Sequence, residues 1–467
     1  MTSSNQKMND FTVLIAGGSL VGLGLALSFE RAGINYELFE KGEFAPQLGA
    51  SIGLHPHTIR ILEQLGAWSD IEGQVVPLQG RNHYDEKGDC FEKSHVLRHI
   101  QRVLRRPIIF MERCKALEAL HSHVIDKSKL HSNSAVVFYE ESDEEVTVTL
   151  NNGTKHRGNL LIGADGVHSK VRDLMADKIN QTDESLAKDI REAFSSEYNC
   201  IFAVSRNGSE KQFLPDAMVH NVYYPGYSAV SAAGVHGLVF WFLFMKASEL
   251  TKLPDCPRFT DEDAEKCIRK YGSSLVGPGY TIQDLWDNRV KASMVPLEEG
   301  VVKQWFHNRV VLIGDAVHKA TVNPGLGGNL AYEGIARLTN GLVSLLKESP
   351  RPSIEELNTV FDTYVAGQKP RAETVVDLSG QITRYEAQDT WILKFAAKYL
   401  VPLVSDSLKA KLYASFSRGG PWLEYLPLPT TDIHSEGLHS SKDFCRGIPM
   451  LVISATLLVG VGSVFLV

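Results

Sequence analysis

A glycine-rich turn near the N-terminus has residue types and spacing suited to holding a pyrophosphate. It reads Gly17-Gly18-Ser19-Leu20-Val21-Gly22. In the usual G-x-G-x-x-G pattern, the first glycine permits the turn, the second admits the phosphate, and the third lets helix and strand pack closely. Gly17 and Gly22 supply the first and third roles. Ser19 takes the second, where its hydroxyl could donate a hydrogen bond to phosphate, and the turn predicts a dinucleotide site.

Carboxylates follow at three places where nucleotide chemistry would need them. Glu40 stands eighteen residues after Gly22, where an acid can accept hydrogen bonds from a ribose diol. Asp165 in GADGVHSKVR and Asp315 in VVLIGDAVHKATVNPGLGGN each lie beside a glycine after an apolar run. A turn aspartate remains the alternative for Asp165, and a helix cap is the alternative for Asp315.

These groups require buried parallel strands to position them. Residues 13–18 and 159–166 are short apolar runs that end in glycine, and 309–316 has the same apolar pattern with a glycine near its end, which predicts buried strands with exit turns. A helix is predicted over 20–32, closed by Gly33, with a second strand over 36–40. The pattern indicates an α/β fold that begins with a βαβ unit.

Composition limits the partners. The 467 residues are 43% hydrophobic and carry a net charge of −7 without a basic stripe, which argues against nucleic acid. Six cysteines are scattered without a C-x-x-C pair, as is typical of a reducing compartment. The polar first ten residues lack a secretory signal. We therefore expect a cytosolic body that acts on small molecules.

The last twenty residues are different. Residues 448–467 read IPMLVISATLLVGVGSVFLV, carry no charge and follow Lys442 and Arg446. Twenty apolar residues suit a transmembrane helix, and the preceding basic residues place the body in the cytosol. We predict a single-pass C-terminal membrane anchor, with the endoplasmic reticulum favoured because its bilayer is thin. The alternative is a core or dimer-interface helix.

The three motifs, in this order, resemble those of single-component FAD-dependent monooxygenases, the PHBH-like group A, over residues 11 to about 420. The stretches GASIGLHPHTIRILEQLGAW, FMERCKALEAL and GGPWLEYLP are similar to the fungal branch that epoxidises prenyl chains in meroterpenoid and indole-diterpene biosynthesis. The Gly-Gly-Ser turn is also familiar in that branch.

The resemblance implies a role for each motif residue. The glycine turn and Glu40 would bind the ADP half of FAD, and Gly53 would lie against the flavin through its backbone. Arg113 would reach the pyrophosphate, with a surface ion pair as its alternative. Asp315 would accept hydrogen bonds from the ribityl hydroxyls, and Asp165 would serve FAD and a transient pyridine nucleotide.

The resemblance also implies the chemistry. The loop at residues 324–329 would press against the isoalloxazine, with a helix starting near Gly328 that points its positive end at the ring. NADPH or NADH would supply hydride, and O2 would add at flavin C4a and pass one oxygen to an alkene of an apolar prenylated substrate. Alternatives are a phenol hydroxylase of the salicylate type and a non-catalytic flavin-binding protein.

Substrate contacts are predicted less directly. Arg191 and Tyr224 fall where related hydroxylases orient a substrate oxygen, although Tyr223 and Tyr227 compete with Tyr224 and an aromatic residue on a strand is more often core. The run at 237–244, GLVFWFLF, could wall an apolar pocket, and the buried face of a sheet is favoured. No metal ligands are predicted, because neither His55 nor His318 has metal spacing around it.

The predicted architecture is a Rossmann-like FAD-binding domain with an inserted mixed β-sheet. The regions are an FAD-binding first part with a substrate-lobe hairpin at 8–190, a substrate-binding sheet at 191–296, an FAD-binding second part at 297–345, a helical region at 346–446 and the anchor at 448–467.

Overall fold

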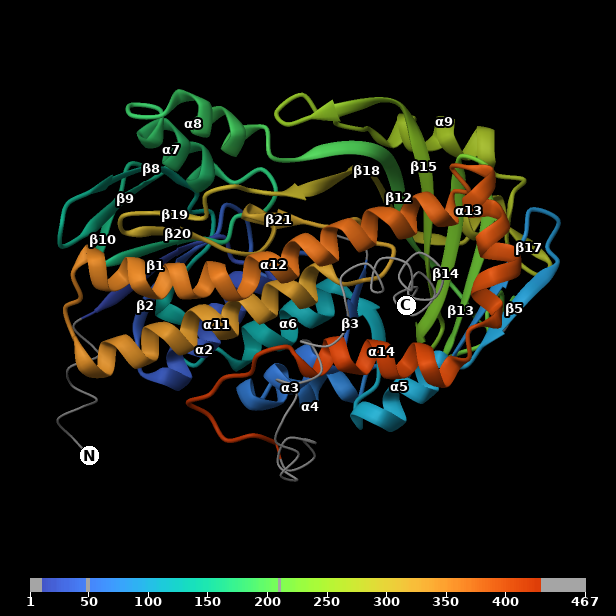
Figure 1. Ribbon diagram of the computed structural model, residues 1–467, viewed down its shortest axis with the longest axis horizontal. Helices are drawn as coiled ribbons and strands as arrows, with labels where there is room; N and C mark the ends of the chain where they lie inside the picture. The colour runs from blue at the N-terminus through green and yellow to red at the C-terminus, as the bar shows by residue number, and fades with distance from the viewer. Residues whose placement is uncertain (1–10, 48–50, 209–210, 430–467) are drawn as a thin grey trace.

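The computed structural model describes residues 11–47, 51–208 and 211–429 (Figure 1). The predicted anchor at 448–467 lies outside these ranges. Within them, every helix is too short or too polar to cross a bilayer.

The first layer is a six-stranded sheet that contains the predicted nucleotide-binding strands. Its order is β19 (Phe306–His307), β20 (Val310–Leu312), β11 (Leu160–Gly163), β1 (Thr12–Ala16), β2 (Asn35–Phe39) and β7 (Leu130–His131). β1 runs parallel to both β2 and β11, and β11 runs parallel to β20. Strands that are far apart in the chain therefore end at the same edge of the sheet, which confirms the α/β prediction.

Helix α2 (Leu20–Ala32) follows β1 as predicted. It ends at Gly33, whose φ of 73° is left-handed and is readily adopted by glycine. The Gly33 amide donates to the carbonyls of Glu30 and Phe29, so carbonyls of the last turn are satisfied.

The second layer is an eight-stranded sheet. Its order is β21 (His318–Lys319), β18 (Arg289–Val301), β12 (Ser195–Arg206), β15 (Leu238–Lys252), β14 (Tyr227–Val235), β13 (Met218–Tyr224), β4 (Gly80–Tyr84) and β5 (Cys90–Ser94). Most of it comes from the region predicted as a substrate sheet. It also takes β4, which pairs in parallel with β13, from the N-terminal region.

Smaller sheets complete the strands. The predicted hairpin near 135–150 is β8 (Val136–Glu141) with β9 (Val146–Leu150), extended by β10 (Lys155–Gly158). The other two pairs are β3 (Ser51–Leu54) with β6 (Ile109–Glu112), and β16 (Leu275–Gly277) with β17 (Tyr280–Thr281).

Two long helices, α11 (Gly327–Glu348) and α12 (Ile354–Glu386), lie side by side across one face of the molecule (Figure 1). α14 (Asp406–Arg418) packs on α5 (Val96–Leu104). The remaining helices are α3 (Pro56–Leu65), α4 (Trp68–Glu72), α6 (Arg113–His123), α7 (Lys170–Ile179), α8 (Glu184–Arg191), α9 (Asp261–Tyr271), α10 (Ile282–Asp287) and α13 (Trp391–Phe395). Short 3₁₀ turns are η1 (Lys127–Lys129), η2 (Gly314–Ala316) and η4 (Val401–Leu403), and η3 (Ala396–Leu400) is a π-helical segment.

The apolar run in β15 packs on both faces of its sheet. Phe240, Phe242 and Phe244 belong to the main hydrophobic core. Trp241 and Leu243 point the other way into a second core cluster on the opposite face. The strand alternation thus gives one face to each core, as period-2 packing requires.

Candidate functional site

A cavity of about 500 Å³ lies between the glycine turn, the start of α11 and the large sheet. All of the predicted cofactor-binding residues except Gly22 line it: Gly17, Ser19, Glu40, Gly53, Arg113, Asp165, Asp315 and Gly328. The predicted residues come from separated parts of the chain, so their convergence is a result of the fold.

The glycine turn is shaped by close packing. Gly17 has a φ of 105°, and a Cβ there would collide with the backbone of Ala164. A Cβ on Gly22 would collide with the Gly17 carbonyl. Gly22 therefore acts as the predicted packing glycine, which explains why it stands behind the cavity wall.

Arg113 lies over the start of α2. Its Nη2 donates to the Ser19 hydroxyl at 2.6 Å, and Ser19 is the N-cap residue of α2. A guanidinium, a hydroxyl and the free amides of a helix N-terminus thus meet at one point. This combination suits a pyrophosphate, because both the donors and the helix dipole favour negative charge.

Glu40 closes the same end of the cavity. Its carboxylate accepts hydrogen bonds from the amides of Gly18 at 2.6 Å and Gly42 at 3.1 Å. These bonds fix the carboxylate beside the turn. An ionised carboxylate has further lone pairs, so Glu40 can also accept from ribose hydroxyls.

Asp315 and Lys319 form an ion pair of 2.6 Å in the cavity wall. Burial would raise the pKa of Asp315, but the charge and hydrogen bond of Lys319 outweigh it and hold the pKa below its ordinary value. The carboxylate is therefore an acceptor at neutral pH. Asp315 follows β20 in the turn η2, where Gly314 has a φ of 65°.

Asp165 has a structural role as well as a place in the lining. Its carboxylate accepts hydrogen bonds from the Ser169 hydroxyl at 2.5 Å and the Val171 amide at 3.1 Å, at the start of α7. Burial raises the pKa of Asp165, although these two hydrogen bonds act to lower it. These contacts support the turn-aspartate alternative, and the predicted shared role toward FAD and pyridine nucleotide stays a prediction.

Asn329 joins the two backbone segments predicted to face a flavin ring. Its amide nitrogen donates to the carbonyls of Gly53 at 2.9 Å and Gly325 at 2.6 Å, and its oxygen accepts from the His55 amide at 2.9 Å. The side chain is fully buried. Asn329 therefore sets the separation of these segments. It lies in the motif that ends with Gly328-Asn329, but the sequence alone did not predict this role for it.

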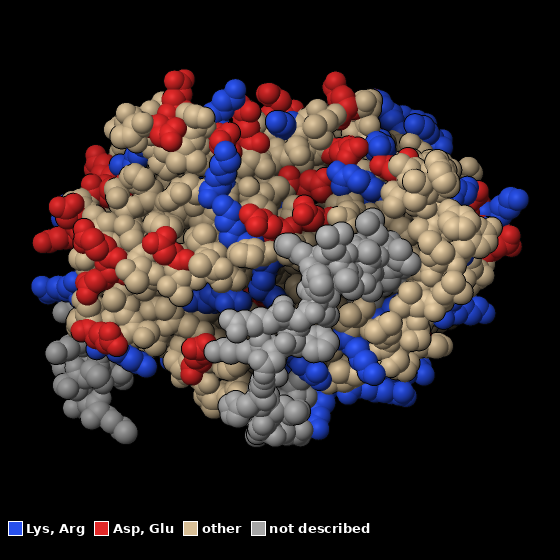
Figure 2. Space-filling view, viewed as in Figure 1, with Lys and Arg blue, Asp and Glu red and all other residues tan. Residues whose placement is uncertain are grey.

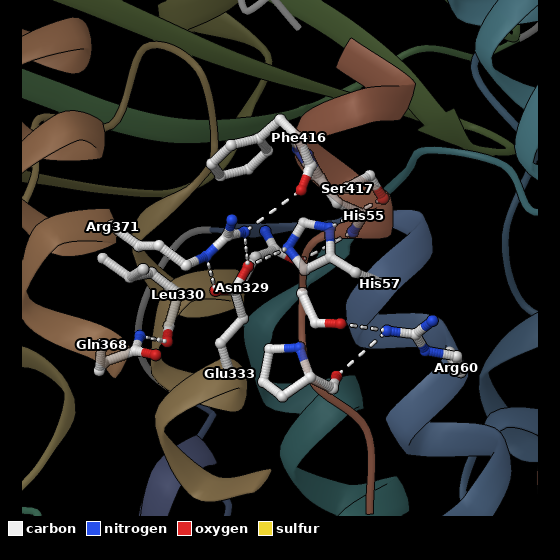
Figure 3. Close-up of polar contacts among 12 residues, drawn as sticks. His55, His57, Arg60, Asn329, Leu330, Glu333, Gln368, Arg371, Phe416 and Ser417 are labelled. Carbon is white, nitrogen blue, oxygen red and sulfur yellow. Dashed lines mark hydrogen bonds and ion pairs between the residues drawn. The ribbon is translucent and has the colours of Figure 1, made fainter. Parts of the chain in front are cut away.

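A buried ionic cluster lies one helical turn further along α11 (Figure 3). Arg371 of α12 donates to both oxygens of Glu333, at 2.5 and 2.6 Å. His57 of α3 lies 3.5 Å from the same carboxylate, and burial, with Arg371 and Arg60 nearby, holds its pKa well below the ordinary value. The imidazole is thus neutral, and the cluster locks α3, α11 and α12 together behind the cavity.

The opposite part of the lining is aromatic. Phe242 of β15 makes edge-on contacts with Phe110, at 5.8 Å between ring centroids, and with Phe202, at 5.5 Å. All three rings line the cavity together with Ile52 and Val322. Within the run 237–244, Phe242 is the residue that lines the described cavity, whereas Phe240 and Phe244 on the same face are buried in the core. The favoured prediction of a buried sheet face is confirmed.

The two predicted substrate-orienting residues lie elsewhere. Arg191 is paired with Asp177 at 2.5 Å on the outer helices α7 and α8. Tyr224 donates to the Leu275 carbonyl at 3.1 Å and stacks on Tyr227. Neither side chain lines the cavity, so its geometry gives no support to their predicted roles.

His55 and His318 are buried. His55 Nδ1 lies 2.7 Å from the Tyr413 hydroxyl, and burial holds its pKa well below the ordinary value. His318 packs against Trp305, and burial lowers its pKa to about 4.

The cavity fits FAD on the chemistry of its donors and acceptors. Arg113 and the α2 N-terminus suit the pyrophosphate, and the two acids suit hydroxyl groups of a ribose and a polyol. Gly327 has open space where a Cβ would stand, so a flat ring can approach the backbone there.

Known proteins agree with this assignment. The family model described as FAD binding domain matches residues 10–197 and 258–379. The FAD-dependent monooxygenase penM of Penicillium crustosum is 35% identical over 90% of this chain and 88% of its own. The FAD-dependent monooxygenase spyC of Aspergillus fumigatus is 35% identical over 92% of this chain and 91% of its own.

The fold also matches solved structures. Klebsiella pneumoniae HpxO complexed with FAD and uric acid superposes with a TM-score of 0.71 at 17% identity, over 89% of this chain and 98% of that chain. At this identity the match supports the architecture alone. Because the family model covers more than half of the chain and curated relatives match about nine tenths of it, the protein belongs to the family of fungal FAD-dependent monooxygenases.

Proposed function

We propose that this flavin monooxygenase uses NADPH or NADH and O2 to epoxidise an alkene of an apolar prenylated intermediate in secondary-metabolite biosynthesis. The observation that carries the proposal is the aromatic wall next to Gly53. A Cβ on Gly53 would lie 3.4 Å from the Phe110 ring, so this wall adjoins the backbone expected to face the flavin. Apolar and aromatic surface of this kind suits a hydrocarbon chain.

The residues of the chain have binding and orienting tasks in this proposal. Reduced FAD would supply the activation of O2. Arg113 and the α2 N-terminus hold the phosphates, and Asp315 holds the polyol. Asn329 keeps the Gly53 and Gly325 carbonyls at fixed positions, so that the ring and the substrate alkene meet in a defined geometry.

The alternative, a phenol hydroxylase of the salicylate type, needs a base that activates the phenol. The described lining also includes titratable residues, among them Asp165, Asp315 and Lys319, and the last two are paired with each other. An alkene needs no base, and the aromatic rings next to Gly53 therefore favour epoxidation.

A direct test uses the purified protein with FAD, NADPH, ¹⁸O2 and two acceptors, one prenylated and one a simple phenol. The expected product is the prenylated acceptor with one ¹⁸O atom, together with substrate-stimulated NADPH oxidation. Labelled hydroxylation of the phenol alone would favour the alternative. NADPH oxidation that neither acceptor stimulates would contradict both.

We also propose that residues 448–467 anchor the cytosolic body in a membrane, with the endoplasmic reticulum as the expected location. Their length and lack of charge support this. Deletion of residues 447–467 should move the protein from the membrane fraction to the soluble fraction. A full-length chain that is already soluble would refute the anchor.

A further inference from the structure

Large apolar side chains are exposed in an unusual concentration near the end of α12. We call them the apolar face, which consists of Trp391, Ile392, Phe395, Tyr399, Leu403 and Leu408. Trp391 is 79% exposed and Leu403 is 80% exposed. An isolated exposed apolar residue needs no explanation, but a group of this size concentrated in one short stretch of the chain indicates a contact surface.

The local structure holds these side chains outward. The rings of Phe395 and Tyr399 lie against each other with centroids 5.1 Å apart, and Leu403 follows in η4; all three side chains are exposed. The small residues Ala396 and Ala397 of η3 are buried. Large apolar side chains are thus exposed on a segment whose buried side chains are also apolar, unlike the polar outer face of an ordinary surface helix.

The composition of the apolar face matches the boundary between water and lipid. Tryptophan and tyrosine are enriched there, because their rings are apolar and their N–H and O–H groups are polar. Lys394 and Lys398 lie on the same segment and pair with Glu86 at 2.9 Å and Asp85 at 2.8 Å. The two lysines thereby balance the negative charges of Glu86 and Asp85 next to the apolar face.

Basic side chains border the apolar face. Arg98 and Arg102 of α5, Arg105 at its C-terminal end and Lys411 of α14 are exposed. α14 packs on α5, and Figure 2 shows Lys and Arg side chains over these helices, below a broad uncharged area over α13. An apolar surface edged by arginine and lysine is complementary to a bilayer with anionic headgroups.

We propose that the apolar face inserts into the surface of an anionic lipid bilayer, with the arginines of α5 and Lys411 contacting the headgroups. This contact is separate from residues 448–467 and goes beyond the proposed function. A second copy of the chain is a poorer occupant, because a symmetric contact would bring two sets of arginines together. The bilayer contact would hold the body at the surface where an apolar substrate dissolves.

Tryptophan fluorescence can test this contact in the full chain. Trp391 is highly exposed, whereas Trp68, Trp241, Trp286 and Trp305 are buried, and Trp422 is partly buried under Arg60. Residues 430–467 contain no tryptophan, so insertion of the C-terminal segment alone brings none into lipid. Vesicles of phosphatidylcholine and phosphatidylserine with brominated acyl chains should quench the emission, and quenching should be lost in Trp391→Phe.

Further variants separate the contributions. Phe395→Ser with Leu403→Ser should reduce quenching of Trp391, whereas Leu250→Ser, an exposed leucine outside the apolar face, should not. Arg98→Gln with Arg102→Gln should weaken quenching by anionic vesicles. Absence of quenching in the wild type, or equal quenching in Trp391→Phe, would overturn the proposal. So would loss of Trp391 exposure to a soluble quencher at raised protein concentration without lipid, which would indicate self-association.

Discussion

The Lys319 ammonium lies 2.6 Å from the Asp315 carboxylate, and both side chains line the cavity formed by the glycine turn and the α11 loop. The pair keeps Asp315 ionised where burial alone would favour its neutral form. An acid held in this state is a strong acceptor for hydroxyl groups of a bound cofactor.

Removing the Asp315 carboxylate should remove the flavin. Asp315→Ala is expected to purify folded, as judged by circular dichroism, but with little bound FAD, because the polyol acceptor is lost. Absorbance near the flavin band measures the occupancy. As a control, Asp183→Ala removes the α8 cap, which should cost about 1 kcal/mol of stability without loss of flavin. Full yellow colour in Asp315→Ala would refute the assignment.

Arg113 should contribute to FAD affinity through charge. Arg113→Ala is expected to raise the dissociation constant of FAD by about 10- to 100-fold, since hydrogen bonds to charged groups contribute about 1.5–3 kcal/mol. Titration of the flavin-free protein with FAD measures this. Arg157→Ala, at an exposed arginine on β10, is the matched control and should bind FAD normally. Unchanged affinity in Arg113→Ala would mean that its bond to Ser19 is only structural.

Asn329 should matter for both stability and flavin geometry. Asn329→Ala leaves the His55 amide and two carbonyls without their partner, which should cost about 3 kcal/mol of unfolding free energy. It should also weaken FAD binding, because the Gly53 and Gly325 segments are no longer joined. Asn340→Ala on the same helix breaks bonds to Trp422 and Glu424 outside the cavity and should leave FAD affinity intact. Equal FAD affinity in both variants would contradict the positioning role.

A buried acid should make stability depend on pH. Glu386 lies 3.2 Å from Arg81, 2.8 Å from Asn221 and 2.6 Å from Asn323, and burial raises its pKa to about 7 despite Arg81. In the unfolded chain a glutamate titrates near about 4.3. Between these values the native state binds the extra proton, so the unfolding free energy should fall as pH rises from about 4 to about 7.

Glu386→Gln should therefore flatten the stability profile over that interval, as measured by urea unfolding at a series of pH values. Glu262→Gln, at an exposed glutamate of α9, is the control and should keep the wild-type profile. A Glu386→Gln profile that parallels the wild type would show that Glu386 does not titrate there.

The sequence predicted the local parts of the site better than its tertiary parts. Glu40 and Asp315 lie in motifs whose spacing indicates a strand followed by a turn, and Arg113 lies in the stretch FMERCKALEAL. The fold brings all three to one cavity. The roles of Lys319 and Asn329 depend on contacts across the fold, although their positions four residues after Asp315 and directly after Gly328 were available signals. The alternation of side chains in 237–244 predicts two faces for this strand. The structure is needed to show which residues lie on each face and that both faces are buried.

Arg191 and Tyr224 illustrate the limit of transferring roles by position. Each was predicted because it falls where related hydroxylases have an arginine or a tyrosine, and such a position along the chain does not determine on which face of an element a side chain lies. In the structure, Arg191 forms an ion pair with Asp177, and the Tyr224 hydroxyl donates to the Leu275 carbonyl. In contrast, the packing role of Gly22 followed from sterics alone and is confirmed.

The most direct test of the account is the visible absorption spectrum of the purified full-length protein, followed by release and identification of its chromophore. The account predicts a yellow protein that carries close to one FAD per chain, or takes it up when FAD is added. A colourless protein that cannot be loaded with FAD would contradict it.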